Sequence, residues 1–87
     1  MDRYAVEVAP RVWDDLKKLP KADVRRIVAR LEKLRDDPRP PGAEKLKGSD
    51  EYRVRQGDYR IVYTVHDVIR LVRVARVGNR RDVYRRR

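Results

Sequence analysis

Three arginines on a predicted β-hairpin form the group of side chains best suited to bind a phosphate. They are Arg53, Arg55 and Arg60, in the stretch "EYRVRQGDYRIVYTV" of residues 51–65. If Gly57-Asp58 forms a two-residue turn, Arg55 and Arg60 face each other across the strands, and like charges in that position destabilise a sheet. Two unit charges about 4 Å apart repel by about 1 kcal/mol in water and by about 4 kcal/mol at an effective dielectric constant of about 20. A bound phosphate would reverse the sign of this energy, so the spacing favours a phosphate site over a loosely splayed, solvated face.

The excess of positive charge lies in the second part of the chain. The 87 residues include 24 Lys and Arg against 14 Asp and Glu. Residues 1–52 carry a net charge of only +2, whereas residues 53–87 carry +8, with eleven arginines and no lysine. Arginine offers a planar fork that matches the oxygens of a phosphate. We therefore expect a polyanionic partner, nucleic acid before membrane, and the alternative is charge kept only for solubility.

Side chains that could transfer a proton are few. The single histidine, His66, falls in a predicted turn, and a sequence without cysteine has no disulfide and no thiolate zinc site. Nothing resembles a carboxylate metal cluster, so we expect no metal and no cofactor. Tyr84 lies close to Arg80 and Arg81, and nearby cations lower the pKa of a tyrosine, which makes the phenol a candidate proton acceptor. The alternative is that its ring packs against the sheet and anchors the terminus.

The spacing of apolar residues predicts the elements that position these side chains. Alternation with period two predicts strands, and a 3.6-residue repeat predicts amphipathic helices. In chain order we expect a strand at 3–8, helices within 9–20 and at 21–36, a connector at 36–42, a hairpin at 51–65, a strand at 68–77 and a short basic helix within 79–87. This order predicts an α+β fold with two N-terminal helices packed on one face of a mostly antiparallel sheet of about four strands, order β-α-α-β-β-β, and a short C-terminal helix. Residues 1–87 would then form a single domain, with the arginines on the uncovered face.

The two turns decide which residues pair in the sheet. A second turn at His66-Asp67 would place Arg73 opposite Arg60, on the same face. A slip of one residue would move Arg73 to the other face. With the first turn at Gly57-Asp58, the expected pairs on the core side are Val54 with Ile61 and Tyr52 with Tyr63.

A resemblance to a known family is carried by three stretches, "LKKLP", "KLKGSDEYRVRQGDYRIVYTV" and "RVGNRRDVYR". The chain resembles, essentially from end to end, the RelE/ParE superfamily of type II toxin–antitoxin toxins, on the RelE side. The hairpin and the closing Gly-x-Arg-Arg-x-x-Tyr pattern are the specific part of the match. The resemblance implies a metal-independent and ribosome-dependent endoribonuclease. It would cut messenger RNA by attack of a ribose 2′-hydroxyl on the adjacent phosphate and so inhibit translation. Apolar runs too short to span a membrane, with no signal-peptide pattern, make a cytoplasmic location the expectation.

The resemblance also implies roles for individual residues. The family's basic pair on the first hairpin strand falls on Arg53 and Arg55, its arginine after the turn on Arg60, and its C-terminal arginine and tyrosine on Arg80 and Tyr84. Arg53 and Arg55 stand where relatives have lysines. Because arginine does not lose its proton, neither can be a general base, and this favours Tyr84 in that role. We expect RNA contacts from Lys45, Lys47, Arg73 and Arg81.

Partners follow from the same resemblance. It implies a cognate acidic antitoxin, RelB-like or Phd-like, that covers the arginine face. The other partners would be the ribosome and messenger RNA, with operator DNA contacted only through the antitoxin complex, and no membrane. Two alternatives remain open: a ParE-like inhibitor of DNA gyrase and a non-catalytic nucleic-acid-binding module. The set of arginines with Tyr84 favours RNA cleavage.

Overall fold

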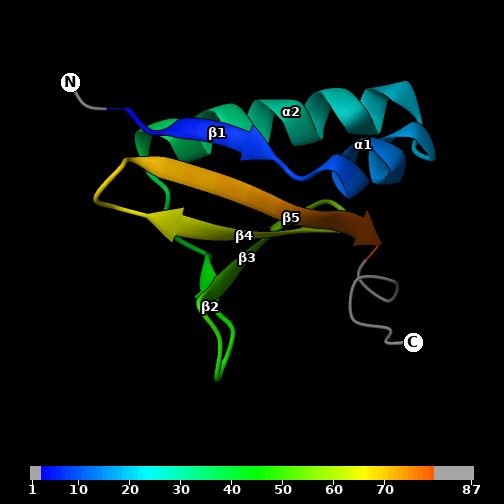
Figure 1. Ribbon diagram of the computed structural model, residues 1–87. Helices are drawn as coiled ribbons and strands as arrows, with labels where there is room; N and C mark the ends of the chain where they lie inside the picture. The colour runs from blue at the N-terminus through cyan, green and yellow to red at the C-terminus, as the bar shows by residue number, and fades with distance from the viewer. Residues whose placement is uncertain (1–2, 80–87) are drawn as a thin grey trace.

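The computed structural model describes residues 3–79 of the chain (Figure 1). The predicted C-terminal helix and the predicted site residues Arg80, Arg81 and Tyr84 lie outside this range. The elements are β1 (Ala5–Val8), α1 (Pro10–Lys17), α2 (Lys21–Asp36), β2 (Glu44–Lys45), β3 (Glu51–Gln56), β4 (Tyr59–His66) and β5 (Leu71–Asn79). The α+β fold is therefore confirmed, with the two-residue strand β2 as an addition to the expected strands.

The strands form one mixed sheet in the order β1-β5-β4-β3-β2. β1 runs parallel to β5, and the other neighbouring strands are antiparallel. α1 packs against β5, and α2 packs against β1 and β3, so both helices cover the same face (Figure 1). The opposite face, which we call the open face, is the one that the arginines were expected to occupy.

The two helices form where the apolar repeat predicted them. α1 begins at Pro10, and proline suits the first turn of a helix because its missing N–H has no intrahelical partner there. α2 buries Ile27, Leu31 and Leu34, which recur at helical spacing on one face. Pro20 separates the helices as the residue that precedes α2.

The core between helices and sheet is centred on the fully buried Tyr63. Its hydroxyl donates a hydrogen bond of 2.7 Å to the carbonyl oxygen of Pro38, which ties the 36–42 connector to β4. Burial raises the pKa of Tyr63 to about 12. The Tyr63 ring stacks on Tyr52 with 5.9 Å between ring centroids, as the predicted pairing of these residues requires.

The register of the β3–β4 hairpin is as predicted. Val54 pairs with Ile61, and Arg55 pairs with Arg60. Gly57, at the first position of the turn, has a φ angle of 62°, which glycine adopts without steric cost.

The predicted register between β4 and β5 is wrong. The turn comprises Asp67–Arg70 rather than His66-Asp67, and His66 pairs with Leu71. Arg73 consequently lies opposite Thr64 instead of Arg60. The cause is long-range, since the Asp67 carboxylate accepts hydrogen bonds of 2.6 Å from the Tyr4 hydroxyl and of 2.9 and 3.2 Å from the Arg39 guanidinium. Val68, expected in a strand, is instead 98% exposed at the turn.

A β-bulge changes the facing of residues along β5. The register shifts between Val62 and Tyr63 on β4, so that Val62 pairs with Arg76 while Tyr63 pairs with Val74. An extra residue in one strand reverses the alternation of side chains beyond it. Arg73 and Arg76, three positions apart, therefore both lie on the open face, although strict alternation would separate them.

Candidate functional site

Two of the three hairpin arginines, Arg55 and Arg60, lie in one row across the open face. Arg55 pairs with Arg60, and Arg60 pairs with Gly78 on β5. The side chain of Arg55 is exposed, and within residues 3–79 no carboxylate lies within ion-pair distance of it. Arg60 differs from the expectation, because it is only 8% exposed.

The neighbouring row contains the third arginine and a carboxylate that the sequence did not single out. Its members, from β2 to β5, are Glu44, Arg53, Val62 and Arg76. Arg53 donates hydrogen bonds to Glu44 of 2.8 Å from Nε and 2.5 Å from Nη2. Glu44 was missed because β2 has only two residues, too few to show a period.

The charges of all three hairpin arginines act on the ionisation of Glu44. Its pKa is lowered, first by the hydrogen bond from Arg53 and its charge, and further by the charges of Arg60 and Arg55. Three guanidinium groups from two rows therefore act on one carboxylate. We call Arg53, Arg55 and Arg60 the arginine cluster. Guanidinium groups form strong, charge-assisted hydrogen bonds to phosphate oxygens, so the cluster is suited to hold a phosphate.

The chemistry open to the arginine cluster is charge stabilisation. Fixed guanidinium groups can stabilise the negative charge that develops on a pentacoordinate phosphorus in the transition state. They cannot take a proton from a ribose hydroxyl, because arginine stays protonated. Among residues 3–79, Glu44 is the side chain in contact with the cluster that could accept a proton. Tyr84 lies outside the described residues.

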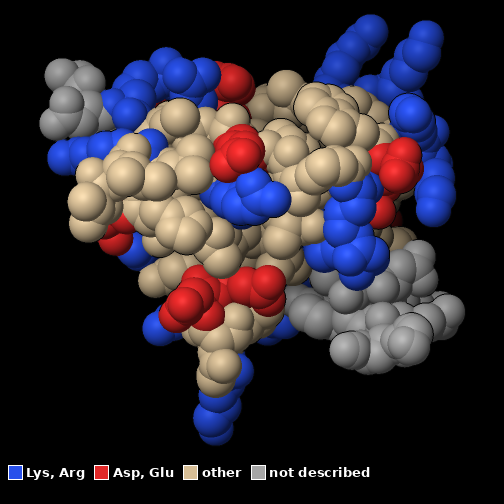
Figure 2. All heavy atoms as spheres, viewed as in Figure 1, with Lys and Arg blue, Asp and Glu red and all other residues tan. Residues whose placement is uncertain are grey.

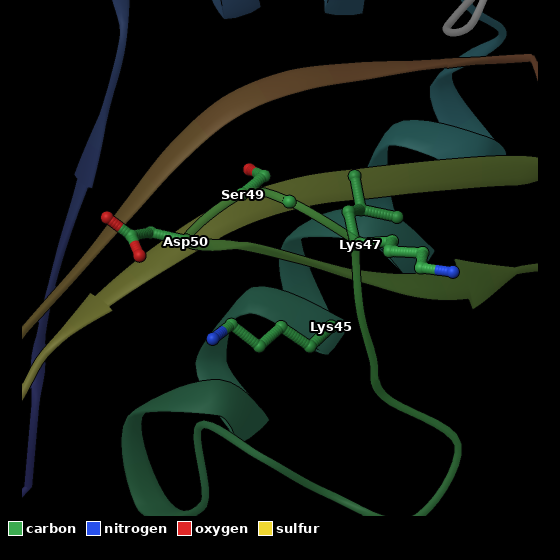
Figure 3. A pocket seen from close by; sticks show the side chains of 6 residues that line it. Lys45, Lys47, Ser49 and Asp50 are labelled. Carbon is green, nitrogen blue, oxygen red and sulfur yellow. The ribbon is translucent and has the colours of Figure 1, made fainter.

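The other predicted RNA-binding residues lie apart from the cluster. Lys45 pairs with Tyr52, a core-side position, so it points to the other face of the sheet from Arg53. Lys45 and Lys47 line a hollow of about 450 Å³ at the β2–β3 loop, and Figure 3 shows their side chains extending in opposite directions. Arg73 forms an ion pair of 3.0 Å with Glu7 and lies in the row of Thr64 rather than that of Arg60.

Positive charge is not confined to the arginine cluster. Figure 2 shows basic side chains projecting from the helical end of the molecule and from the tip of the β2–β3 loop, with acidic side chains between them. Within residues 3–79, no group of three or more His, Asp or Glu side chains is placed to hold a metal ion. None of the helices described here is long and apolar enough to cross a membrane.

The sequence and the fold correspond to a known class of protein. A family model described as the ParE toxin of the type II toxin–antitoxin system parDE matches residues 6–84, so the chain belongs to this toxin family. Within the family it is a RelE-like toxin. It is 34% identical to a Methanocaldococcus jannaschii protein named as toxin RelE1, over 95% of this chain and 97% of that relative.

Solved structures give the same assignment. The RelE of an archaeal RelE–RelB complex from Pyrococcus horikoshii is similar with a TM-score of 0.81 and 32% identity, covering 92% of this chain and 97% of that one. A chain of the toxin–antitoxin complex RelBE2 from Mycobacterium tuberculosis gives a TM-score of 0.81 at 26% identity, covering 90% of this chain and 99% of that one. The isolated Escherichia coli RelE toxin gives a TM-score of 0.76 at 26% identity, covering 87% of this chain and 83% of that one.

Proposed function

We propose that this toxin is a ribosome-dependent endoribonuclease that cuts messenger RNA and thereby inhibits translation. The observation that carries the proposal is the grouping of Arg53, Arg55 and Arg60 on the open face, with Arg53 hydrogen-bonded to the carboxylate of Glu44. A scissile phosphate is also an oxyanion and would take the place where the cluster now holds a carboxylate. The relatives named as RelE support the same activity.

The proposed reaction is an internal transfer of the phosphoryl group. The ribose 2′-oxygen forms a bond to the adjacent phosphorus while the bond from phosphorus to the 5′-oxygen of the next nucleotide breaks. Tyr84 accepts the proton of the 2′-hydroxyl, and Arg55 and Arg60 stabilise the charge on the phosphorane. Arg53 orients the phosphate, and Arg80 stabilises charge on the leaving 5′-oxygen, which takes its proton from solvent. The products are a 2′,3′-cyclic phosphate and a 5′-hydroxyl.

The proposed partner that silences this site is an acidic antitoxin, RelB-like or Phd-like. The similar toxins from Pyrococcus horikoshii and Mycobacterium tuberculosis were solved as toxin–antitoxin complexes. An acidic segment folding across the open face would compete with RNA for the arginine cluster. We place the toxin in the cytoplasm as a single domain of residues 1–87, in contact with operator DNA only through the antitoxin complex.

A second candidate is inhibition of DNA gyrase, because the matching family model is described as ParE. Induction of the toxin in a bacterium separates the candidates when growth, message cleavage by primer extension and DNA breakage are followed together. We expect growth arrest with cuts in translated messages and none in untranslated ones. Gyrase-linked DNA breaks with intact messages would instead support the second candidate, and neither lesion would indicate a non-catalytic binding module.

A further inference from the structure

A separate hollow lies on the open face beside the arginine cluster. It measures about 440 Å³, within the range of about 300–1,000 Å³ that is usual for small-ligand pockets. The floor is formed by Val62 of β4 and Ala75 of β5, and Leu46 of the β2–β3 loop forms one wall. We call this hollow the basin. Val62, Arg73 and Arg76, which line it, lie on the open face of the sheet.

The rim of the basin is cationic. It includes Arg11 at the start of α1 and Arg73 and Arg76 on β5, with Glu51 as an acidic member. The bulge on β5 is what brings Arg73 and Arg76 to the same face. Without this bulge one of the two side chains would point into the core.

The three rim arginines differ in the contacts that they already make with acidic side chains. Arg76 is held from the helix side, with its Nε 3.8 Å from the Asp15 carboxylate, and Asp15 also accepts a hydrogen bond of 3.2 Å from the backbone N–H of Val77. Arg73 uses one nitrogen for its 3.0 Å contact with Glu7 and retains other donors, since a guanidinium has five N–H groups. Arg11 is exposed, and no acidic side chain among residues 3–79 pairs with it.

The basin is next to the arginine cluster. Val62 pairs directly with Arg53 on one side and with Arg76 on the other. Neighbouring strands are about 4.8 Å apart, so Arg53 and the far wall of the basin are separated by a distance that one nucleotide can bridge. An apolar floor with a cationic rim matches the two parts of a nucleotide, its base and its phosphate.

We propose that the basin binds the nucleotide next to the scissile phosphate, with the base on Val62 and Ala75 and its own phosphate at Arg73 and Arg11. Glu51 lies on the rim, where its carboxylate can accept a hydrogen bond from an exocyclic amino group of the base. This assignment rests on the proposed function, because it takes the phosphate at the arginine cluster as the scissile one. It adds a site that selects the sequence around the cut.

The test is equilibrium binding of an uncleavable trinucleotide, 2′-deoxy at the cleaved position and carrying 2-aminopurine at the neighbouring base. The full-length toxin is compared with Ala75→Leu, which fills the basin without changing charge, and Arg73→Gln, which removes one rim charge. The control Arg25→Ala removes an exposed charge from α2, on the helical side of the molecule. Circular dichroism melting verifies that all the variants are folded.

We expect the 2-aminopurine emission to change on binding, and Ala75→Leu and Arg73→Gln each to weaken binding at least fivefold, with Arg25→Ala within twofold of the unaltered toxin. Equal weakening by Arg25→Ala and Arg73→Gln, with no effect of Ala75→Leu, would overturn the assignment in favour of general electrostatic attraction. If Ala75→Leu spares RNA binding and weakens only the complex with the antitoxin, the basin is a protein-docking site and the assignment is overturned as well. If the variants bind as expected but translated messages stay intact, the proposed activity is contradicted, and the basin remains a nucleotide-binding site without a scissile phosphate beside it.

Discussion

Arg55 and Arg60 occupy directly opposite positions on β3 and β4, as a like-charged pair on the open face of the sheet. Pairs of this kind destabilise a sheet, and Arg60 is almost completely buried. Together with Arg53 they act on the carboxylate of Glu44. The loss of stability caused by two opposed arginines is explained if Arg55 and Arg60 bind a phosphate during function.

Arg55→Ala should separate stability from activity. Removal of the exposed partner relieves the cross-strand repulsion, so the melting temperature of the isolated toxin should stay constant or rise. The rate of message cleavage on ribosomes should fall about 10²–10³-fold, as with the loss of one fixed group that stabilises a transition state. Arg55→Lys, which keeps the charge but not the planar fork, should recover part of the rate. A marked fall in melting temperature for Arg55→Ala would assign this residue a structural role instead.

Glu44→Gln should increase the affinity for RNA. The carboxylate neutralises part of the arginine cluster, and its hydrogen bonds with Arg53 must be exchanged when a phosphate arrives. We expect several-fold tighter binding of an uncleavable RNA at low salt, measured by fluorescence anisotropy. The difference should shrink as salt is added, because salt screens exposed charges. Equal affinity of both proteins at every salt concentration would mean that Glu44 does not compete with RNA.

Tyr84→Phe should slow cleavage while leaving ribosome binding nearly intact. A general base contributes about 10²–10⁴-fold to a rate, so we expect at least a tenfold loss in single-turnover cleavage. Co-sedimentation with ribosomes provides the binding control. An unchanged rate for Tyr84→Phe, with a large loss for Glu44→Gln, would move the proton acceptor to Glu44.

Asp67 should make the fold sensitive to acid. Hydrogen bonds, first from Arg39 and then from Tyr4, lower the pKa of Asp67 from its ordinary value of 3.8 to about 2. A depressed folded-state pKa contributes stability that is fully present above the unfolded pKa and is lost as the pH falls through about 2. Asp67→Asn should therefore melt a few degrees lower than the unaltered toxin at pH 7, and this difference should narrow towards pH 2.

Asp50→Asn serves as the control for this pH series, because no side chain among residues 3–79 hydrogen-bonds to the Asp50 carboxylate. Its melting temperature should follow that of the unaltered toxin at each pH. If Asp67→Asn also follows the unaltered toxin throughout, the contacts of Asp67 contribute nothing to stability.

Local signals in the sequence predicted the hairpin, and long-range contacts determined what the sequence did not show. Gly57 and the alternating residues around it were sufficient for the β3–β4 register, which is confirmed. The β4–β5 register depends on Asp67, whose partner Tyr4 is 63 residues away, and on a bulge that no local pattern announces. The partial neutralisation of Arg53 by Glu44 could not be predicted either, because it requires the pairing of β2 with β3.

The most direct test of the central claim uses ribosomes programmed with a short message and the purified toxin. We expect a cut that leaves a 2′,3′-cyclic phosphate and a 5′-hydroxyl, and no cut when the nucleotide before the scissile phosphate is 2′-deoxy. Cleavage of the 2′-deoxy message, or products that carry a 5′-phosphate, would contradict this expectation.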